Sequence, residues 1–284
     1  MKPLMRIVRT VDELRAWSSV NRKEGKTIGL VPTMGALHAG HASLIRAARE
    51  RCDAVAVSIF VNPTQFGPNE DFAKYPRTFD ADCAMAESIG ADIVFAPAVD
   101  ELYPDGAATF VDVEGLSDRL DGGSRPGHFR GVATVVTKLF VAAEADLAFF
   151  GQKDAAQVAV LRRMTADLRL ATEIVVCPIV RESDGLALSS RNVYLTPPQR
   201  HQALALSRAI GVVDSLVGHG QRNVATLIEA AEAVFGAEPD IRVDYISCVN
   251  WATLEPVESA APGTLFAVAA WVGETRLIDN TILS

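Results

Sequence analysis

Along the first two-thirds of the chain, short continuous apolar runs alternate with segments that have the period of a helix. The apolar runs predict β-strands at residues 28–32, 54–61, 92–96, 147–151 and 172–177. The intervening segments predict helices, the clearest carrying an amphipathic stripe of Val132, Val135, Val136, Leu139 and Phe140. Continuous apolar strands separated by helices predict an α/β fold with a parallel sheet covered on both faces.

The pattern changes near Pro178. Two helices are predicted at residues 197–217 and 224–235, and three strands joined by short turns follow them. Helices followed by a strand meander favour a separate, smaller α+β domain. We therefore expect a first domain over residues 1–179 and a C-terminal domain over residues 180–284.

Charge and composition then narrow the function classes. The 284 residues carry 27 Lys and Arg against 35 Asp and Glu, a formal net charge of −8, which disfavours a nucleic-acid partner. No apolar stretch is long enough to span a bilayer, and the N-terminus has no signal-peptide core. The cysteines form no CxxC pair. We therefore expect a cytoplasmic protein that binds neither membrane nor nucleic acid.

Ligands of parallel sheets bind beyond the carboxyl ends of the strands, so the strand-to-helix loops are the candidate sites. The first loop, PTMGALHAGH over residues 32–41, places His38 and His41 between glycines at a helix start. A helix N-terminus is an anion site, and two imidazoles there can donate to a triphosphate as charge builds on the departing pyrophosphate. A zinc pair is the alternative, although no third ligand lies nearby in the sequence.

Three further loops carry polar groups. Asn62 and Gln65 follow a strand as neutral amides, suited to the hydroxyl and carboxylate groups of a small substrate. The segment RPGHFRGV, residues 125–132, adds positive charge before a helix. In FFGQKDAAQ, residues 149–157, Lys153 can bind phosphate, and Asp154 either caps the helix or meets a ribose.

The last polar segment is RESDGLALSSRN, residues 181–192, at the start of the second domain. Ser189, Ser190 and Arg191 supply two hydroxyls and a guanidinium, a set that suits the β- and γ-phosphates of ATP. Its position just past the domain boundary predicts that it reaches the nucleotide when the domains close.

Together, these segments resemble the pantothenate synthetases, a family within the HIGH-type nucleotidyltransferase superfamily. The HIGH-like block PTMGALHAGH is shared with many adenylylating enzymes, whereas NPTQFG and SSRN are more specific to this family. The resemblance covers residues 28–195 and implies a Rossmann-like first domain, a C-terminal lid domain and a homodimer. It also implies a pantoate–β-alanine ligase that uses ATP and Mg²⁺ and proceeds through a pantoyl-adenylate.

The resemblance also assigns roles to individual residues. Catalysis falls to His38, His41, Lys153 and Arg191, with His41 as the proton donor. ATP is bound by Pro32, Thr33, Met34, Gly35, Ala36, Leu37, His38, Gly40, His41, Gly151, Gln152, Lys153, Asp154, Val180, Leu188, Ser189, Ser190 and Arg191. Pantoate and β-alanine are held by Gln65, Gln157, Asn62, Tyr75, Arg125 and His128. Asp80 and Asp82 are candidates for the magnesium environment.

The sequence departs from the family pattern at a few positions. Leu188 stands where Met usually precedes the two serines, and Gln152 replaces a common Glu. Ala155 and Ala156 replace bulkier or polar residues. Ala81 interrupts the acidic stretch that carries the two magnesium candidates.

Three other functions remain as alternatives. A nucleotidyltransferase acting on a phosphate ester would need a second basic pocket, whereas Asn62, Gln65 and Gln157 are neutral. A non-catalytic nucleotide-binding module would have lost catalytic groups, yet His38 and Lys153 are present. A tRNA-charging role is opposed by the net charge and by the lack of an anticodon-binding domain.

Overall fold

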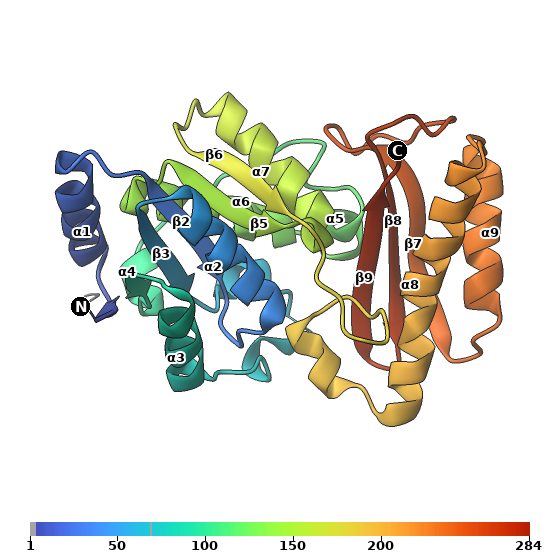
Figure 1. Cartoon of the computed structure of the whole chain (residues 1–284), viewed down its shortest axis with the longest axis horizontal. Helices are drawn as coiled ribbons and strands as arrows, with labels where there is room; N and C mark the ends of the chain where they lie inside the picture. The colour runs from blue at the N-terminus through green and yellow to red at the C-terminus, as the bar shows by residue number, and fades with distance from the viewer. Residues whose placement is uncertain (1–3, 69) are drawn as a thin grey trace. The chain divides into compact units, whose positions relative to one another are not determined.

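The computed structural model describes residues 4–68 and 70–284 and forms two compact units (Figure 1). The first unit comprises Met1–Gly151 and Val160–Cys177, and the second comprises Gln152–Ala159 and Pro178–Ser284. The first three residues, part of the stretch considered for a signal peptide, lie outside the described residues. So does Asn69, which follows the NPTQFG segment by one residue.

The first unit contains a parallel sheet. Within the described residues its strands are β1 (Arg6–Val8), β2 (Ile28–Thr33), β3 (Ala54–Ile59), β4 (Ile93–Phe95), β5 (Leu147–Gly151) and β6 (Glu173–Cys177). They lie in the order β1-β4-β3-β2-β5-β6, and every pairing is parallel. The prediction of an α/β fold with a Rossmann-like parallel sheet is confirmed.

Helices cover both faces of this sheet. On one face, α2 (Ala39–Arg51) and α3 (Phe79–Ile89) bury apolar residues such as Ile45 against Val57 and Phe149 of the strands. On the other face lie α1 (Val11–Lys23) and α6 (His128–Ala143), where the Phe140 ring meets Phe150 of β5 with centroids 6.4 Å apart. Strand side chains alternate between the faces, so both faces need apolar residues and the runs are continuous.

Two N-terminal elements were not predicted. The strand β1 lies at the sheet edge and has only three residues, too few to be recognised as an apolar run in the sequence. The helix α1 does carry a signal, because Thr10 and Glu13 form a capping box at its start. The helix α6 also begins one turn before the predicted start near Val132, which places His128 inside the helix.

Short elements complete the first unit and its connection to the second. They are the helices α4 (Val99–Leu102) and α5 (Asp121–Ser124), and the 3₁₀ turns η1 (Pro63–Gln65) and η2 (Asp71–Ala73). The helix α7 (Ala155–Asp167) begins in the second unit and ends in the first. It is preceded by the 3₁₀ turn η3 (Gln152–Asp154), which belongs to the second unit.

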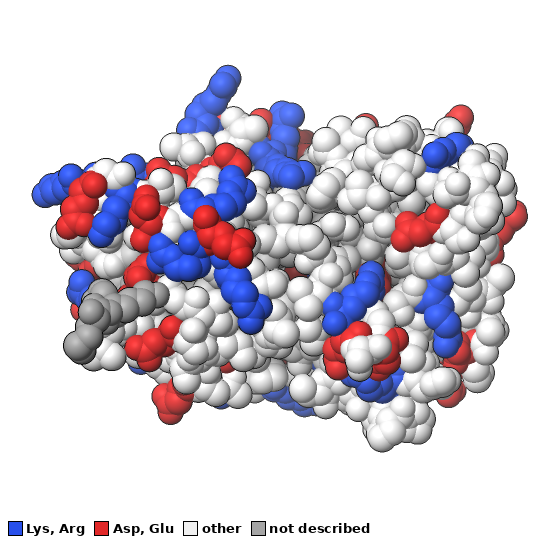
Figure 2. Space-filling view, viewed as in Figure 1, with Lys and Arg blue, Asp and Glu red and all other residues white. Residues whose placement is uncertain are grey.

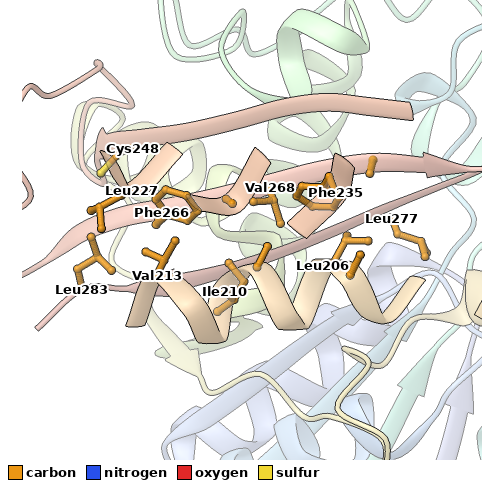
Figure 3. Close-up of a cluster of buried hydrophobic side chains, with 14 of the residues drawn as sticks. Leu206, Ile210, Val213, Leu227, Phe235, Cys248, Phe266, Val268, Leu277 and Leu283 are labelled. Atoms are coloured by element: carbon orange, nitrogen blue, oxygen red, sulfur yellow. The ribbon is translucent and has the colours of Figure 1, made fainter. Parts of the chain in front are cut away.

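The second unit packs two helices on an antiparallel sheet. Strands β7 (Ile241–Asn250), β8 (Thr264–Val272) and β9 (Thr275–Ile282) pair in sequence order, and the helices α8 (Pro197–Gly218) and α9 (Val224–Gly236) cover one face. Figure 3 shows the core between them, in which Leu206, Ile210 and Val213 of α8 meet Phe266 and Val268 of β8. The predicted C-terminal α+β arrangement is confirmed, although residues 251–263 form a longer connection than the short turn expected.

The surface gives no sign of an extended basic face on the side drawn in Figure 2. There, Lys and Arg side chains are interspersed with Asp and Glu over both units. A nucleic-acid binder concentrates basic residues on one face, so this mixture agrees with the acidic composition. Among the described residues, no helix combines the length and apolarity needed to cross a bilayer.

Candidate active site

The strand β2 lies at the topological switch point of the parallel sheet. It pairs with β3 on one side and with β5 on the other, so the connections after β2 and β5 leave in opposite directions. Doubly wound sheets bind ligands in the crevice at this point, beyond the carboxyl ends of the strands. The loop after β2 is the one that carries His38 and His41.

A buried carboxylate holds the backbone of this loop. Asp82 on α3 is 2% exposed, and its two oxygens accept the backbone N–H groups of Ala36 at 2.9 Å and Leu37 at 2.8 Å. The Thr78 hydroxyl also donates to Asp82, at 3.0 Å. Ala36 has a φ of +50°, a conformation that disfavours side chains, and the hydrogen bond to Asp82 compensates for that strain.

The position before Ala36 requires glycine. Gly35 has a φ of +83°, and a Cβ there would lie 3.0 Å from the Asp82 carboxylate and 3.2 Å from Ile59. At the other end of the turn, Thr33 anchors the loop to the sheet. Its hydroxyl donates to the Ser58 carbonyl at 2.7 Å and accepts the Gly35 N–H at 3.2 Å.

The two histidines form the cap of α2. His38 is the N-cap residue, and its Nδ1 accepts the backbone N–H of Gly40 at 3.1 Å. In return, Nδ1 of His41 accepts the backbone N–H of His38 at 3.3 Å. The ring centroids are 4.1 Å apart, so both imidazoles lie on one side of the first turn, as predicted.

The caps determine the tautomers. A nitrogen that accepts a backbone N–H bears no proton, so each neutral ring carries its proton on Nε2. The protein thus presents two Nε2–H donors side by side at the N-terminal end of a 13-residue helix. The positive end of the helix dipole adds to these donors, and the arrangement suits a phosphate or a developing oxyanion.

The loop after β3 is built around a buried amide pair. Asn62 is 1% exposed, and its Nδ2 donates to Oε1 of Gln65 at 3.0 Å and to the Gly131 carbonyl at 3.2 Å. Its Oδ1 accepts from the hydroxyls of Thr64 and Tyr103, at 3.0 Å and 2.9 Å. The Asn62 contact fixes the orientation of the Gln65 amide, whose nitrogen donates to the Met34 sulfur at 3.2 Å.

Gly131 allows α6 to approach this loop. A Cβ at position 131 would lie 2.4 Å from the Thr64 carbonyl oxygen and 2.7 Å from the Gln65 Cα, closer than real Cβ atoms come. Glycine therefore permits the helix to accept the Asn62 hydrogen bond directly on its backbone. The RPGHFRGV segment thus contributes to the site partly through the residue that has no side chain.

Four groups next to it form a hydrogen-bonded chain. Arg125 donates to both Glu70 oxygens, at 2.8 Å and 2.6 Å, and to Nε2 of His128 at 3.0 Å. Nδ1 of His128 lies 2.8 Å from the Gln65 carbonyl, which can only accept, so the ring proton is on Nδ1. Both ring nitrogens of His128 are therefore used, and the imidazole links Arg125 to the Gln65 backbone.

The positive charge predicted for this segment lies on Arg125 and Arg130 and not on His128. Burial of His128, with the nearby Arg125 charge, lowers the pKa of the imidazole to about 4, so it is neutral at physiological pH. Burial alone would raise the pKa of Glu70, but the hydrogen bonds and charge of Arg125 outweigh it and hold that pKa below its usual range. The Arg125 charge is thus compensated by Glu70, and Arg130 stacks on Phe110, 4.3 Å from the ring centre.

Lys153 and Gln157 lie in the second unit. Lys153 is in η3, where its ammonium group lies 3.3 Å from the Asp154 carboxylate. Gln157 follows in the first turn of α7 and is half-buried. Gly151 ends β5 immediately before this segment, so the predicted sequence of strand, glycine and helix is confirmed, with a 3₁₀ turn in between.

The SSRN segment follows a tight hairpin in the same unit. Leu188 N–H donates to the Val180 carbonyl at 2.9 Å, and Glu182 N–H donates to the Leu186 carbonyl at 2.8 Å. The 3₁₀ turn η4 (Ser190–Tyr194) then begins, with the Ser189 hydroxyl oxygen accepting the Arg191 N–H at 3.2 Å. The Ser189 hydroxyl proton remains available to donate.

The remaining predicted residues lie around the first-unit loops. Tyr75 is buried, with its ring 6.0 Å from that of Phe66 in an edge-on contact. Asp80 is exposed on the first turn of α3, whereas Asp82 on the same helix is buried against the histidine loop. In the part of the chain that the structure describes, no three His, Cys, Asp or Glu side chains are grouped to hold a metal ion.

Sequence reasoning missed three contributors. Glu70 was not singled out, although it compensates Arg125, and Gly131 was read only as part of a motif. Asp82 was a candidate for the magnesium environment from the resemblance, whereas its geometry makes it a backbone acceptor. An acidic residue near the start of a helix does not reveal which distant loop it contacts. The only related signal in the sequence is Gly35, which indicates a tight turn in that loop.

The fold and the loops define a class: a Rossmann-like α/β protein with a HIGH-type loop after the strand at the switch point. A family model described as pantoate-beta-alanine ligase matches residues 6–282. The chain belongs to the pantoate–β-alanine ligase family, as the resemblance predicted.

Individual relatives agree along nearly the full chain. A pantothenate synthetase of Koribacter versatilis (strain Ellin345) is 59% identical over 98% of this chain and 96% of its own. The crystal structure of pantothenate synthetase from Thermus thermophilus has a TM-score of 0.93 and 46% identity, covering 98% of this chain and 99% of that one. A pantoate-beta-alanine ligase of Francisella tularensis, complexed with beta-gamma ATP and beta-alanine, has a TM-score of 0.81 at 34% identity and covers 98% and 97%.

We expect Asp82→Asn to lower the free energy of unfolding by about 1–3 kcal/mol, because an amide nitrogen would face one of the two loop N–H groups. Urea denaturation measures the change. Asp80→Asn is the matched control, since that side chain is exposed on the same helix, and it should stay within about 0.5 kcal/mol of the wild type. Equal stability of the two variants would contradict the role given to Asp82.

His128 should make stability depend on pH. Its folded-state pKa of about 4 lies below the usual 6.5, so the unfolded chain binds more protons between these values. The contribution of this residue is complete above pH 6.5 and is lost as the pH falls towards 4, by up to about 3 kcal/mol. Urea denaturation at a series of pH values measures this loss.

The variant His128→Gln supplies the comparison. A glutamine can still donate to the Gln65 carbonyl and accept from Arg125, but it does not titrate. Stability of His128→Gln should therefore fall less steeply than that of the wild type between pH 6.5 and 4. If His128→Gln keeps the wild-type slope, the imidazole is not the titrating group.

Proposed function

We propose that the chain catalyses the ATP-dependent condensation of pantoate with β-alanine, giving pantothenate, AMP and pyrophosphate through a pantoyl-adenylate. One observation carries the proposal beyond family membership. The paired Nε2–H donors of His38 and His41, fixed by their caps at the start of α2, form an anion site suited to a departing pyrophosphate.

The first step is adenylate formation. The pantoate carboxylate attacks the α-phosphorus of ATP, a new O–P bond forms, and the bond to the bridging oxygen of pyrophosphate breaks. Negative charge builds on that oxygen, where the histidine donors and the α2 dipole stabilise it. His41 is the proposed proton donor, through Nε2.

The second step is amide formation. The amine of β-alanine attacks the acyl carbon of the pantoyl-adenylate, AMP leaves with the acyl oxygen, and the amine loses a proton. Since the adenylate already provides a good leaving group, this step makes little demand on the groups that bind the triphosphate. The two half-reactions therefore depend on different residues.

Gln65 is the proposed pantoate ligand in the first unit. Asn62 orients its amide with the nitrogen as a donor, and the neighbouring Arg125 is compensated by Glu70 while His128 is neutral. A pocket of neutral donors suits hydroxyl groups and one carboxylate, and it disfavours a phosphate ester, which needs strong positive charge. This favours pantoate over the phosphate-ester substrate of the alternative reaction. We place Gln157 and Tyr75 in the same role from the family resemblance alone.

Lys153, Ser189, Ser190 and Arg191 are the proposed phosphate ligands of the second unit. The ammonium and guanidinium groups supply charge, and the serine hydroxyls supply directed donors. Gly151, Asp154, Val180 and Leu188 complete the proposed nucleotide site.

Magnesium enters as part of the substrate, Mg-ATP. Both oxygens of Asp82 accept hydrogen bonds from the histidine loop, and the described residues contain no cluster of metal ligands. Mg²⁺ is commonly held by substrate phosphates with few protein ligands, and this arrangement fits that pattern. We propose that Asp82 acts on the loop and that any protein contact to the metal comes from Asp80.

A homodimer is also proposed, from the resemblance, and a cytoplasmic location, from the composition of the chain. The four cysteines are buried thiols without disulfides, which agrees with a reducing compartment. Burial raises the pKa of Cys52 and of Cys248 to about 11, so these two thiols are unreactive.

The test is pyrophosphate release in the absence of β-alanine. Wild-type protein given Mg-ATP and pantoate should release pyrophosphate, because the adenylate forms before the amine attacks. His41→Ala should slow this step by roughly 10²–10³-fold, the cost of losing one oxyanion donor. Release that requires β-alanine would rule out the two-step reaction, and a His41→Ala variant with near wild-type rate would remove His41 from catalysis.

A second comparison tests the SSRN segment. Arg191→Ala should lower kcat/KM for ATP by the equivalent of about 1.5–3 kcal/mol, since it removes a hydrogen bond to a charged group. Leu188→Met, which restores the common family residue, is nearly volume-conserving and should cost less than about 1.5 kcal/mol. If both changes reduce kcat/KM equally, Ser189, Ser190 and Arg191 are not a phosphate clamp.

A further inference from the structure

Contacts with side chains of the second unit, in addition to the chain connection, hold the segment that carries Lys153. Residues 152–159 cluster with that unit, although β5 just before them lies in the parallel sheet of the first. A segment that leaves its own sheet needs partners for its backbone groups, because unpaired buried carbonyls are costly. Those partners identify what holds Lys153.

Asn280 on β9 supplies most of them. Its side chain is 3% exposed, and Nδ2 donates to the carbonyl oxygens of Gln152 at 3.0 Å and Lys153 at 2.9 Å. Its Oδ1 accepts from the Gln152 side-chain amide at 3.3 Å. The Trp251 indole N–H donates to a carbonyl two residues further on, that of Ala155, at 3.0 Å. The turn that presents Lys153 is therefore held by side chains of the C-terminal segment.

The neighbouring residue of β9 holds the other phosphate-binding segment. Asp279 is 2% exposed, and both its oxygens accept from the Arg181 guanidinium, at 2.6 Å and 2.9 Å. Arg181 pairs with Ala187 across the hairpin that leads into Ser189. A bidentate arginine–carboxylate contact fixes orientation as well as distance, so Asp279 sets where this hairpin lies on the unit.

Successive side chains of a strand point to opposite faces of its sheet. Asp279 therefore reaches the SSRN hairpin from one face of the sheet, and Asn280 reaches the Lys153 turn from the other. Both residues are polar and nearly fully buried, and such groups are retained only where their partners satisfy them.

We propose that Asp279 and Asn280 are positioning residues for adenylate formation, which hold the SSRN hairpin and the Lys153 turn in register with each other. Neither side chain touches the substrate in this scheme. The inference rests on the proposed function, since it concerns the step in which Lys153 and Arg191 bind the triphosphate.

The experiment compares adenylation in the variant Asn280→Ala with that in the wild type. Purified full-length protein receives Mg-ATP and pantoate without β-alanine, and pyrophosphate release is followed under single-turnover conditions. Loss of the three hydrogen bonds between Asn280 and the Lys153 turn should slow release about tenfold. Conversion of supplied pantoyl-adenylate and β-alanine to pantothenate should change less than about twofold, because that step does not use Lys153.

Coupling to Lys153 separates positioning from a merely structural role. In a Lys153→Ala background, Asn280→Ala should slow release by less than about twofold, because the side chain that it positions is already gone. Asn223→Ala is the matched control. It removes an N-cap contact of α9 to the Thr226 N–H at 3.0 Å, so it destabilises the same unit away from the turn and should leave release unchanged.

Each result has a definite meaning. Equal slowing in both backgrounds, or slowing no greater than that of Asn223→Ala, would overturn the inference while the proposed function stands. Wild-type protein without pantoate-dependent release would overturn both. Should Asn280→Ala fail to fold, Asn280→Ser replaces it, since a hydroxyl has a single donor and cannot make both hydrogen bonds to the Gln152 and Lys153 carbonyls. A loss of about two- to fivefold that disappears in the Lys153→Ala background is then expected, and no loss would overturn the inference.

Discussion

The contact between the Asp82 carboxylate and the backbone of the histidine loop is the constraint on which the rest of the first-unit site depends. Two N–H groups converge on one buried acceptor only if the chain turns sharply, and that turn requires positive φ at Gly35 and Ala36. The turn delivers His38 to the N-cap of α2, and the cap then fixes both imidazole tautomers. The tautomers of the two rings thus follow from a backbone conformation that Asp82 of α3 holds.

The polar groups around Gln65 in the same unit hold one another in place and carry little net charge. Asn62 and Gln65 orient each other, His128 is neutral because it is buried beside a cation, and Glu70 compensates that cation. Buried polar groups that are fully satisfied rigidify a site, whereas a partly satisfied network would be costly. If Gln65 binds pantoate as proposed, selectivity rests on directed neutral donors more than on electrostatic attraction.

The two cations among the proposed phosphate ligands lie in the second unit. Lys153 and Arg191 both belong to it, one through the turn held by Asn280 and the other through the hairpin held by Asp279. The sheet that supports them packs against α8 and α9 through an apolar core. The polar residues Asp279 and Asn280 interrupt the apolar side chains of β9 at adjacent positions. The proposed catalytic groups are therefore divided, with directed neutral donors in one unit and cations in the other.

The sequence by itself determined the strands β2 to β9, most helices and the family, because apolar periodicity and contiguous motifs are local properties of the chain. It also placed both histidines correctly, since the cap geometry is set within a single helical turn. Only the tertiary structure decided that Asp82 is an acceptor for the loop, that His128 is neutral, and that the Lys153 turn depends on Asn280. These outcomes depend on burial and on partners far away in the chain: Asp82 lies 46 residues from Ala36, and Asn280 lies 127 from Lys153. No local pattern encodes such contacts, because hydrogen bonds between distant segments form only after the sheets and helices have packed.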